Sequence, residues 1–120
     1  MSQVLTIELE TLPVSINDIW TVARGRLVKS PKYKAWREAT AWQMKAQCKA
    51  RLTGPYALHV ELCAPDKRAR DLDNFSFKAL SDAAQDAGVI ENDSKCVRLK
   101  SKWVSGGPAV RAWFISTLED

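Results

Sequence analysis

Histidine and cysteine are scarce in this chain of 120 residues, and their scarcity excludes several kinds of site. His59 is the only histidine, and Cys48, Cys63 and Cys96 are widely spaced, without a Cys-x-x-Cys pair. A zinc site is therefore not expected. A serine hydrolase is not expected either, because no serine has a histidine partner in a recognisable motif. An odd and sparse set of cysteines is typical of reduced thiols in a cytosolic protein.

Long apolar runs are also missing. No stretch approaches the roughly 18 apolar residues that a membrane-spanning helix needs, and no signal-peptide pattern opens the chain. We therefore expect a cytoplasmic protein with no membrane partner. A glycine-rich phosphate loop of the Walker type is absent from the sequence as well.

The chain does have a mild excess of positive charge and many tryptophans. Eighteen Lys and Arg residues stand against 14 Asp and Glu, which gives a net charge of +4 at pH 7. That excess favours a polyanionic partner such as nucleic acid, although many cytosolic proteins are as basic without one. The tryptophans could fill a core, line a dimer interface or stack on bases, and they are Trp20, Trp36, Trp42, Trp103 and Trp113.

The first half of the chain contains two predicted strands and one predicted helix. Residues 4–9 alternate between apolar and polar, as in a half-buried strand, and a loop is predicted for residues 13–29. Ser30-Pro31 is typical of a helix start, and apolar residues recur at helical spacing from there to about Ala50. After a glycine and a proline, residues 57–62 alternate again and predict the second strand.

The second half contains a second predicted helix and two more strands. The helix is expected from about Asn74 to Ala87, with Gly88 as its cap. Residues 97–103 predict a third strand with one cationic face, and residues 110–118 a fourth strand that we expect to form a hairpin with the third. The helix positions expected to be buried are Phe75, Ala79, Leu80, Ala83 and Ala87, and the cationic face consists of Arg98, Lys100 and Lys102.

Together these elements predict an α+β fold in a single domain, residues 1–120. We expect a small mixed sheet of about four strands with two main helices packed on it, in the order strand, helix, strand, helix, strand, strand. A chain of this length buries a modest core, so association into an oligomer would add buried surface. Because a fold class does not determine function, the function has to be sought in particular side chains.

The residues with the most chemical information are the acids of the segment 70–74, Arg-Asp-Leu-Asp-Asn, and Asp93 after the second helix. In an extended segment, Asp71 and Asp73 would present both carboxylates on one side, with Leu72 facing the core. Two neighbouring carboxylates repel each other unless a cation lies between them, and oxygen ligands suit Mg²⁺ or Mn²⁺. The turn after the second helix could bring Asp93 toward the pair, which would complete a phosphodiesterase-type metal site.

The same acidic pair has simpler interpretations. An Asp-x-Asp sequence at the start of a helix is often a cap plus a solvated acid favoured by the helix dipole, and for this motif alone capping is the more common case. A calcium loop is excluded because Phe75 and Ser76 stand where a ligand and a glycine are required.

Cations surround the acids in the sequence. A phosphate-cutting site needs positive side chains to hold the DNA backbone and to stabilise developing charge. A solvated basic loop is an equally good interpretation of Lys67 and Arg68, and for the cationic face of the third strand contact with water is favoured over contact with phosphate. The candidate cations near the acids are Lys67, Arg68, Arg70, Lys78 and Lys95.

In combination, these motifs resemble the RusA-type Holliday junction resolvases of bacteria and their phages. The resemblance rests on residues 70–74, on Lys78 in the following helix, on Gly88-Val89 and on Asn92-Asp93-Ser94. It covers nearly the whole chain, because similarity extends to residues 12–17, 30–33, Trp36, Arg37 and 65–68.

The resemblance implies a homodimeric, Mg²⁺-dependent endonuclease that resolves four-way DNA junctions in recombination and repair, with Mn²⁺ as an alternative ion. A two-fold dimer would place two equivalent sites against a two-fold junction, so that paired nicks fall on opposed strands. Carried over to this sequence, the metal-binding acids correspond to Asp71, Asp73 and Asp93, and the catalytic lysine corresponds to Lys78. The residues expected to contact DNA are Lys67, Arg68, Arg70, Asn74 and Lys95.

One spacing departs from the family pattern. The family's lysine usually follows the second aspartate of the pair by four residues, but Lys78 follows Asp73 by five. Within a helix, one extra residue rotates later side chains by about 100° unless a π-bulge absorbs it. Either residues 75–77 contain such a bulge, or Lys78 points away from the site and another cation takes its place.

Two other functions stay open from the residues alone. A non-catalytic protein that binds branched DNA would use the same basic surface, with the acids as helix caps, and would bind junctions without a divalent ion and never cut them. A nuclease for other branched or flapped DNA would differ only in its substrate.

Overall fold

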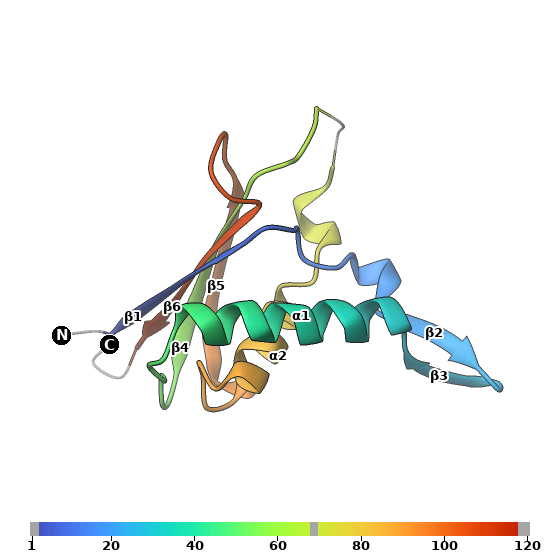
Figure 1. The fold of residues 1–120 in the computed structure, drawn as a ribbon, viewed down its shortest axis with the longest axis horizontal. Helices are drawn as coiled ribbons and strands as arrows, with labels where there is room; N and C mark the ends of the chain where they lie inside the picture. The colour runs from blue at the N-terminus through green and yellow to red at the C-terminus, as the bar shows by residue number, and fades with distance from the viewer. Residues whose placement is uncertain (1–2, 68–69, 118–120) are drawn as a thin grey trace.

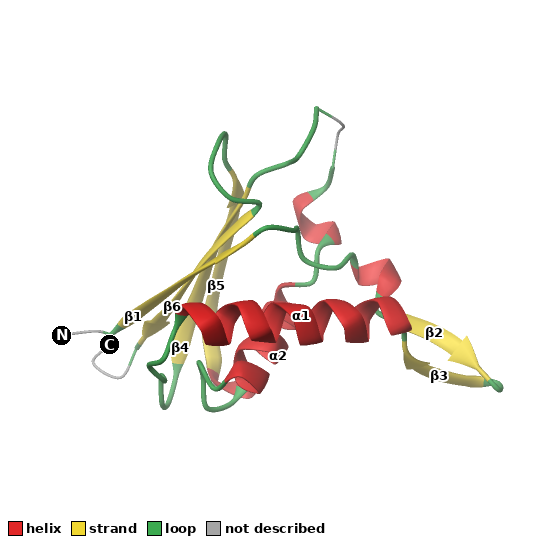
Figure 2. Cartoon of the chain, in the orientation of Figure 1, coloured by secondary structure: helices red, strands yellow, loops and turns green. Residues whose placement is uncertain are grey.

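The computed structural model describes residues 3–67 and 70–117. Two helices, a four-stranded mixed sheet and a separate two-stranded sheet confirm the predicted α+β class (Figure 2). No helix in this described part is long and apolar enough to cross a membrane. The elements are β1 (Val4–Leu9), the 3₁₀ helix η1 (Ile16–Asp18), β2 (Trp20–Ala23), β3 (Arg26–Lys29), α1 (Pro31–Gln47), β4 (Tyr56–Leu62), η2 (Leu72–Asn74), α2 (Phe77–Ala87), η3 (Asp93–Lys95), β5 (Cys96–Trp103) and β6 (Val110–Ser116).

The larger sheet has the strand order β1-β6-β4-β5. β6 pairs antiparallel with both β1 and β4, whereas β5 pairs parallel with β4. The expected hairpin of the last two strands is therefore wrong. Parallel neighbours need a crossover connection, which α2 provides between β4 and β5. The sequences of β5 and β6 explain their places in the sheet. β6 carries apolar side chains on both faces, as an inner strand does, and β5 carries cations that suit an edge strand.

Both helices pack on one side of this sheet (Figure 1). Ile7 of β1 and Phe114 of β6 are fully buried there, together with Met44 of α1 and Leu80 of α2. The expected cationic face of β5 is exposed to solvent on the strand's other side. The sheet thus has one covered face, which forms the core, and one open face.

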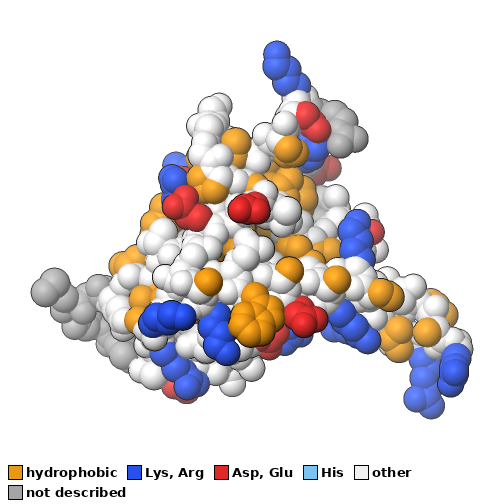
Figure 3. All heavy atoms as spheres, in the orientation of Figure 1, with side chains coloured by type: hydrophobic (Ala, Val, Ile, Leu, Met, Phe, Trp, Pro, Cys, Tyr) orange, Lys and Arg blue, Asp and Glu red, His pale blue; other side chains and the backbone are white. Residues whose placement is uncertain are grey.

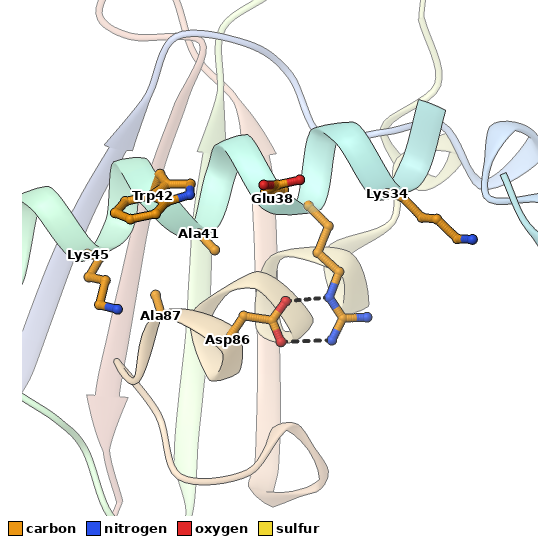
Figure 4. A pocket seen from close by; sticks show the side chains of 8 residues that line it. Lys34, Glu38, Ala41, Trp42, Lys45, Asp86 and Ala87 are labelled. Atoms are coloured by element: carbon orange, nitrogen blue, oxygen red, sulfur yellow. Dashed lines mark hydrogen bonds and ion pairs between the residues drawn. The ribbon is translucent and has the colours of Figure 1, made fainter. Parts of the chain in front are cut away.

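A bidentate ion pair joins the two helices beside a hollow that they enclose (Figure 4). Arg37 of α1 donates to both carboxylate oxygens of Asp86 of α2, at 2.6 and 3.0 Å. Trp42 lies at the other end of the hollow and is 66% exposed. This hollow belongs to the packing of α1 against α2 and lies apart from the acidic motifs.

The helices begin and end at identifiable caps. The Ser30 hydroxyl accepts a hydrogen bond from the Tyr33 amide, as the sequence predicts, but α1 ends at Gln47 instead of about residue 50. The second helix begins at Phe77 instead of Asn74, because Phe75 is extended and the Ser76 hydroxyl accepts from the Ala79 amide.

The second helix ends as predicted. Gly88 has φ +79°, a left-handed conformation that favours glycine after a helix. Three of the five positions expected to be buried are buried, Ala79, Leu80 and Ala83. Phe75 and Ala87 are only partly buried, because they lie at the two ends of the face that α2 packs against the core.

Residues 13–29 are not the plain loop that was predicted. They contain η1 and a hairpin in which β2 pairs with β3, from Trp20 opposite Lys29 to Ala23 opposite Arg26. The hairpin projects beyond the start of α1 (Figure 1). All four β2 residues are exposed, so the hairpin lacks the buried face that makes a strand recognisable from sequence.

The tryptophans have different surroundings. Trp36 and Trp103 are partly buried against the core. Trp113 is partly buried on the open face of the sheet, in a hollow that it shares with His59. Trp20 and Trp42 are about half and two-thirds exposed, at 48% and 66%. The core therefore explains only part of the high tryptophan count.

Candidate active site

Asp71 and Asp73 lie on a tight turn beneath the long loop that follows β4. The turn is a 3₁₀ helix in which the Asn74 amide donates to the Asp71 carbonyl at 3.1 Å, so the expected extended segment is wrong at this point. Both acids are nevertheless exposed and line a single hollow of about 690 Å³. Leu72, between them, is partly buried against the core, as predicted.

Contacts with the N-terminal segment hold this turn in place. Phe75 forms a β-bridge with Ser15, and the Ser76 amide donates to the Val14 carbonyl at 3.1 Å. Phe75 also packs edge-on against Trp103, with 5.9 Å between the ring centres. Through these contacts Ile16 comes to line the same hollow as the two acids.

Lys78 connects this hollow with a smaller one next to it. It lines the first with Asp71 and Asp73, and the second, of about 160 Å³, with Asp93. Its ammonium nitrogen lies 2.8 Å from Asp93 Oδ2 and 3.1 Å from Asp82 Oδ1. Lys78 thus shares a hollow with the two predicted acids Asp71 and Asp73. It is paired with the third predicted acid, Asp93, and with Asp82, which the sequence did not indicate.

Of the two explanations offered for the shifted spacing of Lys78, the π-bulge is wrong. The segment 75–76 is extended, and the helix begins only at Phe77. The extra residue therefore lies in an extended link, where it does not rotate the helix, and no π-bulge is present at residues 75–77. Lys78 faces the site from the first turn of α2.

Asp93 opens η3 and is held by several polar contacts. Its amide donates to the side-chain oxygen of Gln85 at 2.8 Å, and its carbonyl accepts from the hydroxyl of Tyr56 at 3.3 Å. The Asn92 side chain caps the short helix by accepting from the Ser94 amide. These contacts fix η3 beside α2, with the Asp93 side chain 22% exposed.

Lys78, Asp82 and Asp93 stabilise one another's charged forms. The hydrogen bond to Asp93, and then that to Asp82, raises the pKa of Lys78 against the opposing effect of burial. Burial acts to raise the pKa of Asp82, but its interaction with Asp93 and the hydrogen bonds that it accepts from Tyr33 and Lys78 outweigh burial and lower that pKa overall. Lys78 therefore stays protonated and Asp82 ionised at neutral pH.

Tyr33 of α1 completes this group from the far side of Asp82. Its hydroxyl donates to Asp82 Oδ2 at 2.7 Å, and burial, followed by the contact with Asp82, raises the pKa of Tyr33 to about 12. Sequence reasoning assigned neither Asp82 nor Tyr33 to the site. Asp82 carried a signal, since it stands four residues after Lys78 on one helix face. Tyr33 is 49 residues from Asp82, and no local pattern connects them.

The cations expected to contact DNA do not all gather at the acids. Arg70 lines the acidic hollow, whereas Lys95 lies on η3 next to Asp93. Each pairs with an acid four residues before it, at 2.7 and 3.4 Å. Lys67 and Asn74 are exposed outside the lining of that hollow, and Arg68 lies outside the described residues.

The ligand chemistry of the acidic hollow fits a hard divalent cation. Mg²⁺ is commonly bound in proteins by one or two carboxylates, while water and phosphate oxygens supply the rest. Asp71 and Asp73 meet that requirement from one turn. In residues 3–67 and 70–117, no three His, Cys, Asp or Glu side chains lie close enough together to share an ion, so Asp93 is not grouped with the pair.

Comparison with known proteins identifies a family. The model of the family described as "Endodeoxyribonuclease RusA" matches residues 12–112. A protein of Aquifex aeolicus (strain VF5), named "Crossover junction endodeoxyribonuclease RusA", is 31% identical over 88 residues, which cover 72% of this chain and 69% of the relative. The matched range spans the positions of Asp71, Asp73, Lys78 and Asp93. This chain therefore belongs to the RusA family of endodeoxyribonucleases.

Proposed function

We propose that this protein cuts four-way DNA junctions by metal-assisted hydrolysis of phosphodiester bonds, in DNA recombination and repair. One observation carries the proposal: in a chain of an endodeoxyribonuclease family, two exposed carboxylates and a lysine ammonium line one hollow. The substrate is suggested by the name of the relative from Aquifex aeolicus, which refers to crossover junctions. Because such DNA lies in the cytoplasm of a bacterium, the proposal places the protein there.

Each residue of the site has a proposed role. Asp71 and Asp73 would hold Mg²⁺, or Mn²⁺ in its place. Such an ion, when bound, polarises a phosphate and makes a bound water more acidic. The ammonium of Lys78 would stabilise negative charge that develops on the phosphate oxygens. Asp93 fixes that ammonium from the adjoining hollow and is the third candidate ligand.

We also propose that the working form is a homodimer. Asp93 is not grouped with Asp71 and Asp73 in one described subunit, but in a symmetric pair Asp93 of the partner subunit could approach them. A two-fold dimer would also present two equivalent sites to a junction that has two-fold symmetry. Dimerisation would then serve both the metal site and the pairing of the two cuts.

The DNA backbone would be held by the cations around the hollow. Arg70 lines it, Lys95 follows Asp93, and Lys67, Arg68 and Asn74 belong to the segments on either side of the acids. Contacts of this kind make affinity fall steeply with salt concentration, because counterions are released from the phosphates on binding.

The test is to incubate the protein with a labelled four-way junction and with a linear duplex of the same sequence, in Mg²⁺ and in EDTA. The proposal predicts paired nicks in the junction with Mg²⁺, none in EDTA, and little cutting of the duplex. Binding of the junction without cutting in either condition would favour the non-catalytic alternative. Equal cutting of flapped or forked DNA would favour the nuclease of broader substrate range.

A further inference from the structure

A long stretch of the chain is basic without interruption. No Asp or Glu stands between Asp18 and Glu38, an interval that contains six Lys and Arg residues. Two of these six are neutralised, Lys32 by Asp18 and Arg37 by Asp86. In the described part of the chain, Arg24 and Arg26 lie within ion-pair distance of no acid. Of the four other cations, Lys34 lies on α1, and Arg24, Arg26 and Lys29 lie on the β2–β3 hairpin, which we call the basic hairpin (residues 20–29).

The basic hairpin presents apolar side chains next to these cations. Val22 lies opposite Leu27 in the pairing of the two strands, and they are 70% and 64% exposed. Trp20, on the same face two residues before Val22, is 48% exposed and lies under the ammonium of Lys29 at 3.9 Å. Figure 3 shows Lys and Arg side chains and hydrophobic ones together at this end of the molecule. An isolated two-stranded hairpin is marginal in water, so a surface of this composition suggests a partner.

The base of the basic hairpin is tied to the acidic hollow. The segment just before it contains Ile16, which lines that hollow with Asp71 and Asp73. The Ser30 amide, at the end of β3, donates to the Ile19 carbonyl at 2.7 Å and closes the base. The segment that leads into the hairpin therefore lines the hollow, and the hairpin projects beyond the start of α1 (Figure 1).

We propose that the basic hairpin is a DNA-binding arm in which Arg24 and Arg26 contact phosphates of the duplex that enters the acidic hollow. The inference rests on the proposed function, since it takes the partner to be the DNA that is cut. Arginine suits phosphate because its guanidinium can donate two parallel hydrogen bonds. A two-stranded ribbon is also narrow enough for the major groove, where Trp20, Val22 and Leu27 would face sugars and base edges.

Charge favours DNA over a second copy of the chain as the partner. The four-stranded sheet has two edges that a hairpin could extend, β1 and β5. Glu8 on the β1 edge is already paired with Arg111 at 3.2 Å, and the open face of the β5 edge carries Arg98, Lys100 and Lys102. A basic hairpin on the β5 edge would bring like charges together, which opposes association. A polyanion has no such penalty.

The test compares two double variants that remove the same charge. Arg24→Asn with Arg26→Gln changes the basic hairpin, and asparagine tolerates the positive φ of Arg24. Lys45→Gln with Lys49→Gln changes exposed lysines at and beyond the opposite end of α1 and is the control. Binding of a four-way junction and of a linear duplex is measured in Ca²⁺ without Mg²⁺, over a range of salt concentrations.

We expect the hairpin variant to bind the junction roughly tenfold more weakly at 0.1 M salt. Its plot of log affinity against log salt should be shallower by about 0.9 for each phosphate that an arginine no longer neutralises, which is about 1.8 for one hairpin and about 3.6 if both hairpins of a dimer contact the junction. The control should change both quantities much less.

Unchanged binding by the hairpin variant, or equally weakened binding by both variants, would overturn the arm while leaving the proposed function in place. A shift in molar mass by light scattering in the hairpin variant alone would also overturn it, because the hairpin would then be a subunit contact. If the unaltered protein neither binds nor cuts junctions, the proposed function itself fails.

Discussion

The ammonium nitrogen of Lys78 lies 2.8 Å from a carboxylate oxygen of Asp93, although the two residues are 15 positions apart. This ion pair joins the first turn of α2 to η3, and so connects the hollow of Asp71 and Asp73 with that of Asp93. It also bears on the spacing of Lys78, which follows Asp73 by five residues where the family pattern has four. The link before α2 is extended, and the lysine still reaches the third acid.

Replacing Lys78 tests whether its charge serves the reaction. Lys78→Met keeps a side chain of similar length without the ammonium, and should slow single-turnover junction cleavage by about 10²- to 10³-fold, as the loss of one charge-stabilising donor does in other enzymes. Lys78→Arg keeps the charge and should recover part of the rate. Junction affinity measured without Mg²⁺ should fall far less than the rate. Cleavage by the Met variant at the unaltered rate would assign Lys78 a structural role only.

Mixed dimers test how the three acids come together. If Asp93 of one subunit serves the Asp71–Asp73 pair of the other, Asp73→Asn and Asp93→Asn chains that are inactive alone should regain cleavage when mixed. One of the two sites in each mixed dimer would then carry all three acids. Each mixed dimer should cut at about half the rate of the unaltered dimer and make single nicks. An equimolar mixture, in which random exchange makes about half of the dimers mixed, should therefore reach about a quarter of that rate. A mixture that stays inactive, with subunit exchange verified by mass, would place all three ligands within one chain.

The pH dependence of stability tests the contacts of Asp82. Its pKa in the folded protein lies below the ordinary value of 3.8, so its ionised form stabilises the fold at pH values above 3.8. That contribution is lost as pH falls through the lowered folded pKa. Urea unfolding of the unaltered protein and of Asp82→Asn should therefore differ most near neutral pH, and the difference should shrink as the pH falls below the ordinary value of 3.8. A difference that is independent of pH would show that the charge of Asp82 does not contribute.

Much of the fold follows from periodicity and caps. Strand β1, the start of α1 at Ser30 and the end of α2 at Gly88 each have a local physical signal, and the structure has all three where they are predicted. The pairing of β5 could not be read in this way. Strand order depends on which edges meet after the helices have packed, and a glycine-containing turn between β5 and β6 indicates only that the chain reverses.

The candidate site, like the fold, is only partly predictable from the sequence. The acidic pair and Lys78 stand close together in sequence, and the motif that contains them identifies the hollow. Tyr33 and Asp82 meet because α1 crosses α2, a contact between helices that neither sequence segment encodes by itself. The basic hairpin was missed for a different reason. No residue of its two strands is buried, so the sequence lacks the alternation of apolar and polar residues that marks a half-buried strand.

The central claim is that Asp71 and Asp73 hold the ion that the cutting of junctions requires, and replacement of one carboxylate tests it most directly. Single-turnover cleavage of a four-way junction in Mg²⁺ is measured for Asp73→Asn and for Glu38→Gln, which makes the same charge change on the exposed side of α1. Asp73→Asn should bind the junction but cut it at least about 10³-fold more slowly, whereas Glu38→Gln should cut it at the normal rate. Cleavage by a folded Asp73→Asn protein at the rate of the unaltered enzyme would show that Asp73 does not hold the ion.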